Sequence, residues 1–146
     1  MEDAPARICD FPAWETLPDF GLYMDQLLTF TERCFPGAVT PGMINSYVKA
    51  GIVDRPQGKK YSRQALAQLL MVCGLKPATP LEALRQLLHP AAGEDTEGLY
   101  ATFRADWAAL QESLPLQAGR DALRCAIGAA CCQARCRELL EAASAG

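Results

Sequence analysis

The stretch from Thr40 to Lys76 constrains the fold most, because it holds the start signals of two helices with a basic turn between them. Thr40 followed by Pro41 predicts a helix start, since Thr can accept a backbone N–H bond and Pro gives up a donor that lacks a partner there. Gly51 predicts the end of that helix. Ser62 predicts the cap of the next helix, whose apolar residues recur at i, i+3, i+4 and i+7: Leu66, Leu69, Leu70 and Cys73.

The residues between these two helices predict a hairpin-like wing. Ile52 and Val53 form a short extended segment, and the run from Arg55 to Gly58 has the composition of a turn. The chain then returns through the basic pair Lys59 and Lys60 before the second helix begins.

The charge of the chain changes sign in this region. Between Met43 and Lys76 there are six basic residues and one acidic residue, a net charge of +5, whereas the rest of the chain has eight basic and sixteen acidic residues, a net charge of −8. Such a reversal is typical of a localised polyanion-binding surface, and the alternative is an ordinary solvated face. The overall charge of −3 argues against a non-specific nucleic-acid coat. The basic residues are Lys49, Arg55, Lys59, Lys60, Arg63 and Lys76. Four of them, Arg55, Lys59, Lys60 and Arg63, are candidate DNA-binding residues around the predicted wing.

The helix that starts at Thr40 has two faces. The inward face is predicted to carry Met43, Ile44, Tyr47 and Val48. The outward face then carries three candidate DNA-binding residues: Asn45, Ser46 and Lys49. Asn can bond adenine in a bidentate way and Lys can reach guanine or phosphate, although exposed polar residues often have no such role.

A preceding helix is predicted from Asp19 or Phe20 to Cys34, ended by Phe35-Pro36-Gly37. Together the two helices predict a helix-turn-helix with the later one as recognition helix. The predicted apolar stripe of the earlier helix consists of Tyr23, Leu27, Phe30 and Cys34. The segment before it is expected to fold back onto the core through Phe11, Trp14 and Leu17.

Several motifs resemble known families. Tyr47, Gly51, the apolar pair after it and the basic wing ending in Tyr61 resemble the MerR-type winged helix-turn-helix, although Asn45 and Ser46 stand where that family usually has an Arg and an aromatic residue. A closer resemblance, over Trp14 to Leu88, is to a bacterial family of uncharacterised proteins, a domain of unknown function. It rests on L-P-x-x-x-L-Y-M-D-Q, M-I-N-S-Y-V-K and K-K-Y-S-R. The resemblance implies a winged fold and DNA binding, with no established activity.

The remainder of the chain predicts further helices. Thr79-Pro80-Leu81-Glu82 reads as a capping box, followed by a stripe of Leu81, Leu84, Leu87 and Leu88. This helix completes a predicted winged domain over residues 14–90, and a small acidic linker follows. Two helices, Thr96 to Leu114 and Gln117 to about Ala143, form a predicted C-terminal helical extension over residues 96–143. The face of the first comprises Leu99, Phe103, Trp107 and Leu110.

Cysteine and histidine usage predicts neither a metal site nor an enzyme. Four cysteines, Cys125, Cys131, Cys132 and Cys136, could suggest a metal site, but one straight helix cannot wrap four ligands around an ion. Cys125, Cys132 and Cys136 share a stripe of small residues and are expected to pack against another helix, whereas Cys131 lies off that stripe. His89 is the only histidine. The chain contains no GxGxxG, P-loop or HExxH motif. We therefore expect no cofactor and no catalytic residue.

The sequence thus predicts a mainly α-helical, MerR-like, DNA-binding transcriptional regulator that binds double-stranded DNA. The alternative is a protein-interaction or assembly module that binds no DNA. Surplus apolar residues after Gln117 predict a homodimer through the C-terminal helices, unless the preceding helix covers them within one chain. The chain has no run of roughly 20 apolar residues and no signal peptide at its acidic N-terminus, so we expect a cytoplasmic protein without a membrane span.

Overall fold

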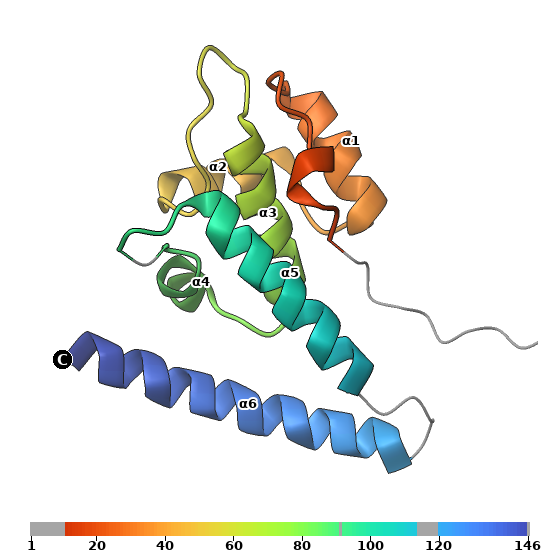
Figure 1. Ribbon diagram of the computed structural model, residues 1–146, viewed down its shortest axis with the longest axis vertical. Helices are drawn as coiled ribbons and strands as arrows, with labels where there is room; N and C mark the ends of the chain where they lie inside the picture. The colour runs from red at the N-terminus through yellow and green to blue at the C-terminus, as the bar shows by residue number, and fades with distance from the viewer. Residues whose placement is uncertain (1–10, 91, 114–119, 146) are drawn as a thin grey trace, which may run out of the picture.

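The computed structural model describes residues 11–90, 92–113 and 120–145, and these residues are mainly helical. Over this part of the chain there are no strands, only two isolated β-bridges, so the prediction of a mainly α-helical fold is confirmed. Figure 1 shows the helices in order along the chain. They are a short 3₁₀ turn η1 (Trp14–Thr16), α1 (Met24–Cys34), α2 (Pro41–Lys49), α3 (Arg63–Leu75), α4 (Leu81–Leu87), α5 (Thr96–Ser113) and α6 (Arg120–Ala145).

Helix α3 is the centre of the core. All nine residues from Ala65 to Cys73 are buried, so the helix is covered on every side, as its apolar sequence requires. Its predicted cap is confirmed, because the Ser62 hydroxyl oxygen accepts the Ala65 N–H at 3.1 Å. The elements before α6, including the fold-back segment with Phe11, Trp14 and Leu17, contribute buried or partly buried side chains around this helix.

Helix α1 begins later than the sequence predicted. The start at Asp19 or Phe20 is wrong, because Gly21 has a φ of +81° and Leu22 pairs with Tyr61 as an isolated bridge. The helix starts at Met24 after Tyr23, whose backbone N–H donates to the Gln26 side chain at 2.9 Å. Tyr23 was also wrongly placed in the apolar stripe, since it is 47% exposed. The fully buried positions of α1 are Leu27 and Thr31.

Helix α2 agrees with the prediction. The Thr40 hydroxyl oxygen accepts the Met43 N–H at 3.2 Å, and Pro41 occupies the first turn. Ile44 and Tyr47 are buried, and Met43 and Val48 pack against the same core. Gly51 has a φ of +79°, the left-handed conformation expected after the helix.

The turn between α2 and α3 is shifted by two residues from its predicted position. It spans Gln57 to Lys60, whose backbones exchange hydrogen bonds of 2.9 and 3.0 Å, rather than Arg55 to Gly58. Gly58 and Lys59 both have positive φ (55° and 76°), which is the signature of a type I′ turn. Ile52 and Val53 form no strand; their N–H groups bond back to the Tyr47 carbonyl at the end of α2.

The predicted capping box before α4 is wrong. Pro80 is the N-cap residue and no side chain bonds there, because the helix starts one residue later than expected and leaves Thr79 outside. Leu84 and Leu88 are buried as predicted, but Leu81 is 47% exposed.

Helix α5 packs along α3 through an aromatic cluster. The Phe11 ring lies 4.8 Å from Phe103 and 4.9 Å from Trp107, both edge-on. Gly74 allows this approach, since a Cβ there would lie 2.7 Å from Phe11. Leu110 does not join the face as predicted and is 65% exposed.

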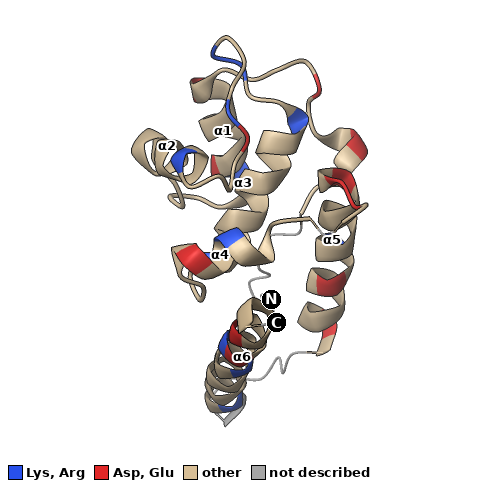
Figure 2. Ribbon diagram, turned by 90° about the vertical axis from the view of Figure 1, so that its left-hand side faces the viewer, with Lys and Arg blue, Asp and Glu red and all other residues tan. Residues whose placement is uncertain are grey.

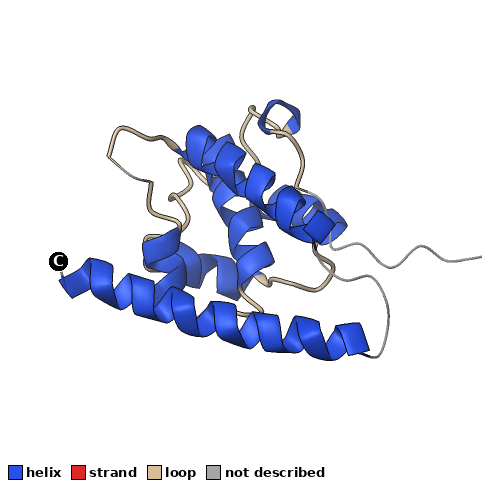
Figure 3. Cartoon of the chain, turned by 60° about the horizontal axis from the view of Figure 1, so that its bottom comes forward, coloured by secondary structure: helices blue, strands red, loops and turns tan. Residues whose placement is uncertain are grey.

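Helix α6 lies on the outside of the molecule, as Figures 1 and 3 show. It is attached near the start of α4, where the Gln133 amide donates to the Ala78 carbonyl at 2.9 Å. The predicted cysteine stripe is not packed throughout, because Cys132 is exposed while Cys125 and Cys136 are half-buried. The predicted helix boundaries at Leu114 and Gln117 lie outside the described residues.

Candidate nucleic-acid interface

The outward face of α2 presents the three polar residues that the sequence singled out. Asn45, Ser46 and Lys49 are all exposed, while Ile44 and Tyr47 on the opposite face hold the helix to the core. The Ser46 hydroxyl donates to the Gly42 carbonyl at 3.1 Å, which uses its proton within the helix and leaves its oxygen able to accept. The face therefore offers an amide, a hydroxyl acceptor and an ammonium group.

The hairpin, defined here as residues 54–61, adds three exposed cations to this surface: Arg55, Lys59 and Lys60. Figure 2 shows the basic residues of the hairpin and of α2 on one part of the molecule, and acidic residues along α5 on another. Residues 92–113 contain five acidic side chains and one Arg. The charge separation noted in the sequence is thus also a separation in space.

Gln68 of α3 holds the base of the hairpin. Its side-chain oxygen accepts the Asp54 N–H at 2.7 Å, and its amide donates to the Asp54 carboxylate at 3.2 Å. Gln68 is 8% exposed. Sequence reasoning missed this residue, and its only signal was a polar side chain within an otherwise apolar helix.

The other end of the hairpin is held by the segment before α1. Leu22 and Tyr61 exchange backbone hydrogen bonds of 2.9 and 2.7 Å. The Lys60 ammonium lies over the Tyr23 ring, 5.4 Å from its centroid, and its stem packs against Gly21. Both ends of the hairpin are therefore attached to the helical core.

Arg63 lies differently from the other candidate cations. Its guanidinium lies 3.6 Å from the Asp19 carboxylate and 5.4 Å from the Trp14 ring centroid, and its side chain is 22% exposed. These contacts tie the start of α3 to the N-terminal segment. A contact between Arg63 and DNA stays a prediction.

Lys76 does not belong to the basic surface, because its ammonium donates to the Ala38 carbonyl in the loop after α1. It lines a cavity of about 510 Å³ together with Cys34 and Cys73. Burial raises the pKa of the Cys73 thiol to about 12, so it stays protonated near neutral pH. Within the described ranges, no three His, Cys, Asp or Glu side chains are arranged so that they could hold a metal ion.

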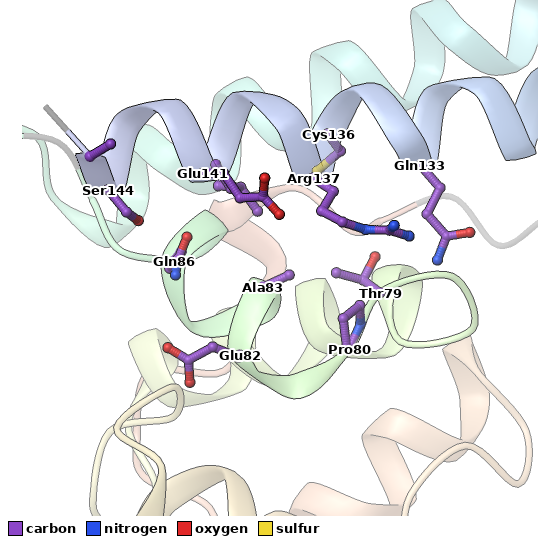
Figure 4. A pocket seen from close by; sticks show the side chains of 12 residues that line it. Thr79, Pro80, Glu82, Ala83, Gln86, Gln133, Cys136, Arg137, Glu141 and Ser144 are labelled. Carbon is purple, nitrogen blue, oxygen red and sulfur yellow. The ribbon is translucent and has the colours of Figure 1, made fainter.

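A second hollow lies between α4 and α6 and has a volume of about 580 Å³ (Figure 4). Its walls include Pro80, Ala83 and Gln86 from the α4 side and Cys136, Arg137 and Leu140 from α6. The two helices are therefore not in continuous contact along this surface.

Comparison with known proteins identifies one family. A family model described as "Domain of unknown function (DUF1836)" matches residues 12–103, which include η1, α1 to α4 and the first part of α5. No curated protein and no solved structure matches the chain. In the part of the chain with described coordinates, no helix combines the length and apolar character needed to span a bilayer.

Proposed function

The chain belongs to the family of domains of unknown function DUF1836, and from its basic surface we propose that it is a DNA-binding transcriptional regulator. In this proposal α1 and α2 form a helix-turn-helix and the hairpin forms its wing, in the manner of MerR-like domains. Helix α2 enters the major groove of double-stranded DNA, and the hairpin contacts the flanking backbone.

The observation that carries the proposal is the rigid presentation of exposed cations beside a polar helix face. Lys59 and Lys60 lie at a turn that is held at both ends, by Gln68 through Asp54 and by Leu22 through Tyr61. A solvated surface loop needs no such attachment. Because the backbone that carries these cations is already held, the hairpin loses less conformational freedom when they bind phosphates.

The exposed residues of α2 are suited to two kinds of contact with DNA. Asn45 is suited to bidentate bonding of adenine, and Ser46 offers an acceptor to a base edge. Lys49, in the last turn of the helix, is suited to guanine or phosphate. Asn45 is therefore the main specificity residue in this proposal, and the hairpin cations provide affinity that does not depend on sequence.

Selection of duplexes from a random pool tests this proposal. The full-length protein is expected to enrich a common sequence in the presence of excess non-specific competitor DNA. Asn45→Ala should relax the preference at one or two base pairs while leaving non-specific affinity unchanged. A pool that stays random after repeated rounds would contradict sequence-specific binding.

A second candidate function, a protein-interaction or assembly module, is favoured by the surface of α6. Leu123, Ile127 and Leu139 are 62%, 54% and 61% exposed, which is unusual for large apolar side chains on one helix. We propose that a second copy of the chain covers part of this surface. A homodimer of this kind is compatible with DNA binding, because paired helix-turn-helix domains read two half-sites.

A further inference from the structure

Phe20 is the most exposed large apolar side chain among the described residues, at 71%. It lies in the segment before α1 rather than on α6, and it does not pack against the core. Its neighbours along the chain have defined roles: Asp19 faces Arg63, and Gly21 packs against the Lys60 stem. An exposed aromatic ring thus lies next to the basic hairpin.

Phe20 is flanked by a backbone attachment on one side and by a side-chain ion pair on the other. Two residues later, Leu22 exchanges hydrogen bonds of 2.9 and 2.7 Å with Tyr61. One residue earlier, the Asp19 carboxylate lies 3.6 Å from Arg63, which in turn stacks on Trp14. The left-handed conformation of Gly21 (φ +81°) turns the chain between these two attachments. Phe20 is therefore presented outward on a short, constrained segment.

We propose that Phe20 is an apolar wedge that enters a base step of the DNA duplex next to the hairpin. This inference rests on the proposed DNA binding, and it adds that the bound duplex is kinked. Proteins that insert a Phe side chain between bases unstack the step partly and kink the duplex, and they hold the flanking phosphates with cations. Lys60 supplies such a cation one residue from the Leu22–Tyr61 bridge.

The cations of the hairpin favour DNA over a protein partner for this aromatic group, and the acidic chain neighbour of Phe20, Asp19, is paired with Arg63 at 3.6 Å. The Lys60 ammonium lies 5.4 Å from the centroid of the Tyr23 ring, so the cation and the half-exposed ring form one surface beside Phe20. Arg55 and Lys59 extend the same surface along the hairpin. A purely apolar docking site would be expected to lack this density of charge.

The test compares duplexes that differ in the free energy needed to unstack one base step. A duplex of about 30 base pairs carrying the selected sequence is prepared with a single T·T mismatch placed at each position in turn. A mismatched step is cheaper to open, so a wedge binds it more tightly at the one position where it inserts. We expect the wild-type protein to bind one mismatched duplex about tenfold more tightly than the matched duplex, a gain of about 1.4 kcal/mol.

Three variants make the test specific. Phe20→Ala should lose the mismatch preference, and Phe20→Leu, which keeps an apolar side chain, should retain it. Leu110→Ala removes an equally exposed apolar residue from α5 and should behave as the wild type. An identical mismatch profile in Phe20→Ala would overturn the wedge alone. Failure of the wild-type protein to bind any duplex would overturn the proposed function and the wedge together.

Discussion

Lys59 is the only described residue other than glycine with a positive φ. A side chain in the left-handed region costs free energy that glycine would avoid, yet the tip of the hairpin has Gly58-Lys59 rather than two glycines. Residues held in such conformations often lie at functional sites, where the side chain is worth the strain. The ammonium of Lys59 is the group that the proposed function uses.

Replacing Lys59 with Gly should therefore separate stability from function. We expect Lys59→Gly to raise the free energy of unfolding by up to about 1 kcal/mol, because the strain at φ 76° is relieved. DNA affinity should fall in the same variant. Gly58→Ala, where a Cβ would meet no neighbouring atom, should instead destabilise through backbone strain alone. Urea unfolding of the three proteins measures this, and a less stable Lys59→Gly would contradict the assignment of strain.

The buried thiol of Cys73 leads to a second prediction, which concerns the stability of the fold at alkaline pH. Its folded pKa is raised to about 12 by burial, from an ordinary value of 9.0. The folded state therefore holds the thiol proton more tightly than the unfolded state does, so stability should be intact below pH 9 and fall between pH 9 and 12. Burial also raises the pKa of Tyr47, which adds to the same trend.

Thermal unfolding from pH 8 to pH 11 tests this prediction. The loss of stability with pH should be smaller in Cys73→Ala than in the wild type, because one of the two groups whose pKa burial raises is then absent. Equal slopes for the two proteins would show that Cys73 does not contribute.

At the scale of elements, the sequence predicted the caps of α2 and α3 correctly, misplaced the cap of α4 by one residue, and failed where a distant segment decides. Thr40 and Ser62 cap α2 and α3 as expected, because these contacts are local. The start of α1 was misplaced because Leu22 pairs with Tyr61, far along the chain. The support of the hairpin by Gln68 was missed for the same reason, since it is a contact over 14 residues.

Gln68→Ala tests whether that support matters. The change removes both hydrogen bonds to Asp54 and leaves the Asp54 N–H without its partner, so we expect a loss of about 1–3 kcal/mol in stability. Gln64→Ala, an exposed position one turn earlier on α3, is the matched control and should cost much less. Amide hydrogen exchange should also quicken in the hairpin of the Gln68 variant. Unchanged exchange there would mean that the Leu22–Tyr61 bridge alone is sufficient.

At the scale of the whole molecule, the chain combines a basic surface, an acidic helix α5 and an outer helix α6. The family match ends at residue 103, within α5, so α6 lies beyond it. The sequence predicted surplus apolar residues at this end, and the structure leaves Leu123 and Ile127 exposed one turn apart. The proposed homodimer would cover them with a second copy of the chain, and a single sequence carries no direct signal of such a contact.

Sedimentation equilibrium at micromolar concentration tests the homodimer. The wild type is expected to show twice the chain mass. Leu123→Glu combined with Ile127→Glu should give a monomer, because each copy would bring two carboxylates into the buried interface. Leu110→Glu, equally exposed on α5, should leave the dimer intact. A monomer mass for the wild type at every concentration would contradict the proposed homodimer.

The central claim, that the hairpin and α2 bind DNA, is tested most directly by the salt dependence of affinity. Binding of a selected duplex is measured from about 50 to 200 mM salt for the wild type and for Lys59→Ala combined with Lys60→Ala. A control variant, Arg85→Ala combined with Arg135→Ala, removes two exposed cations from α4 and α6. The account predicts that the slope of log K against log salt flattens by about 0.9 per lost phosphate contact in the hairpin variant only. An equal slope in all three proteins would contradict it.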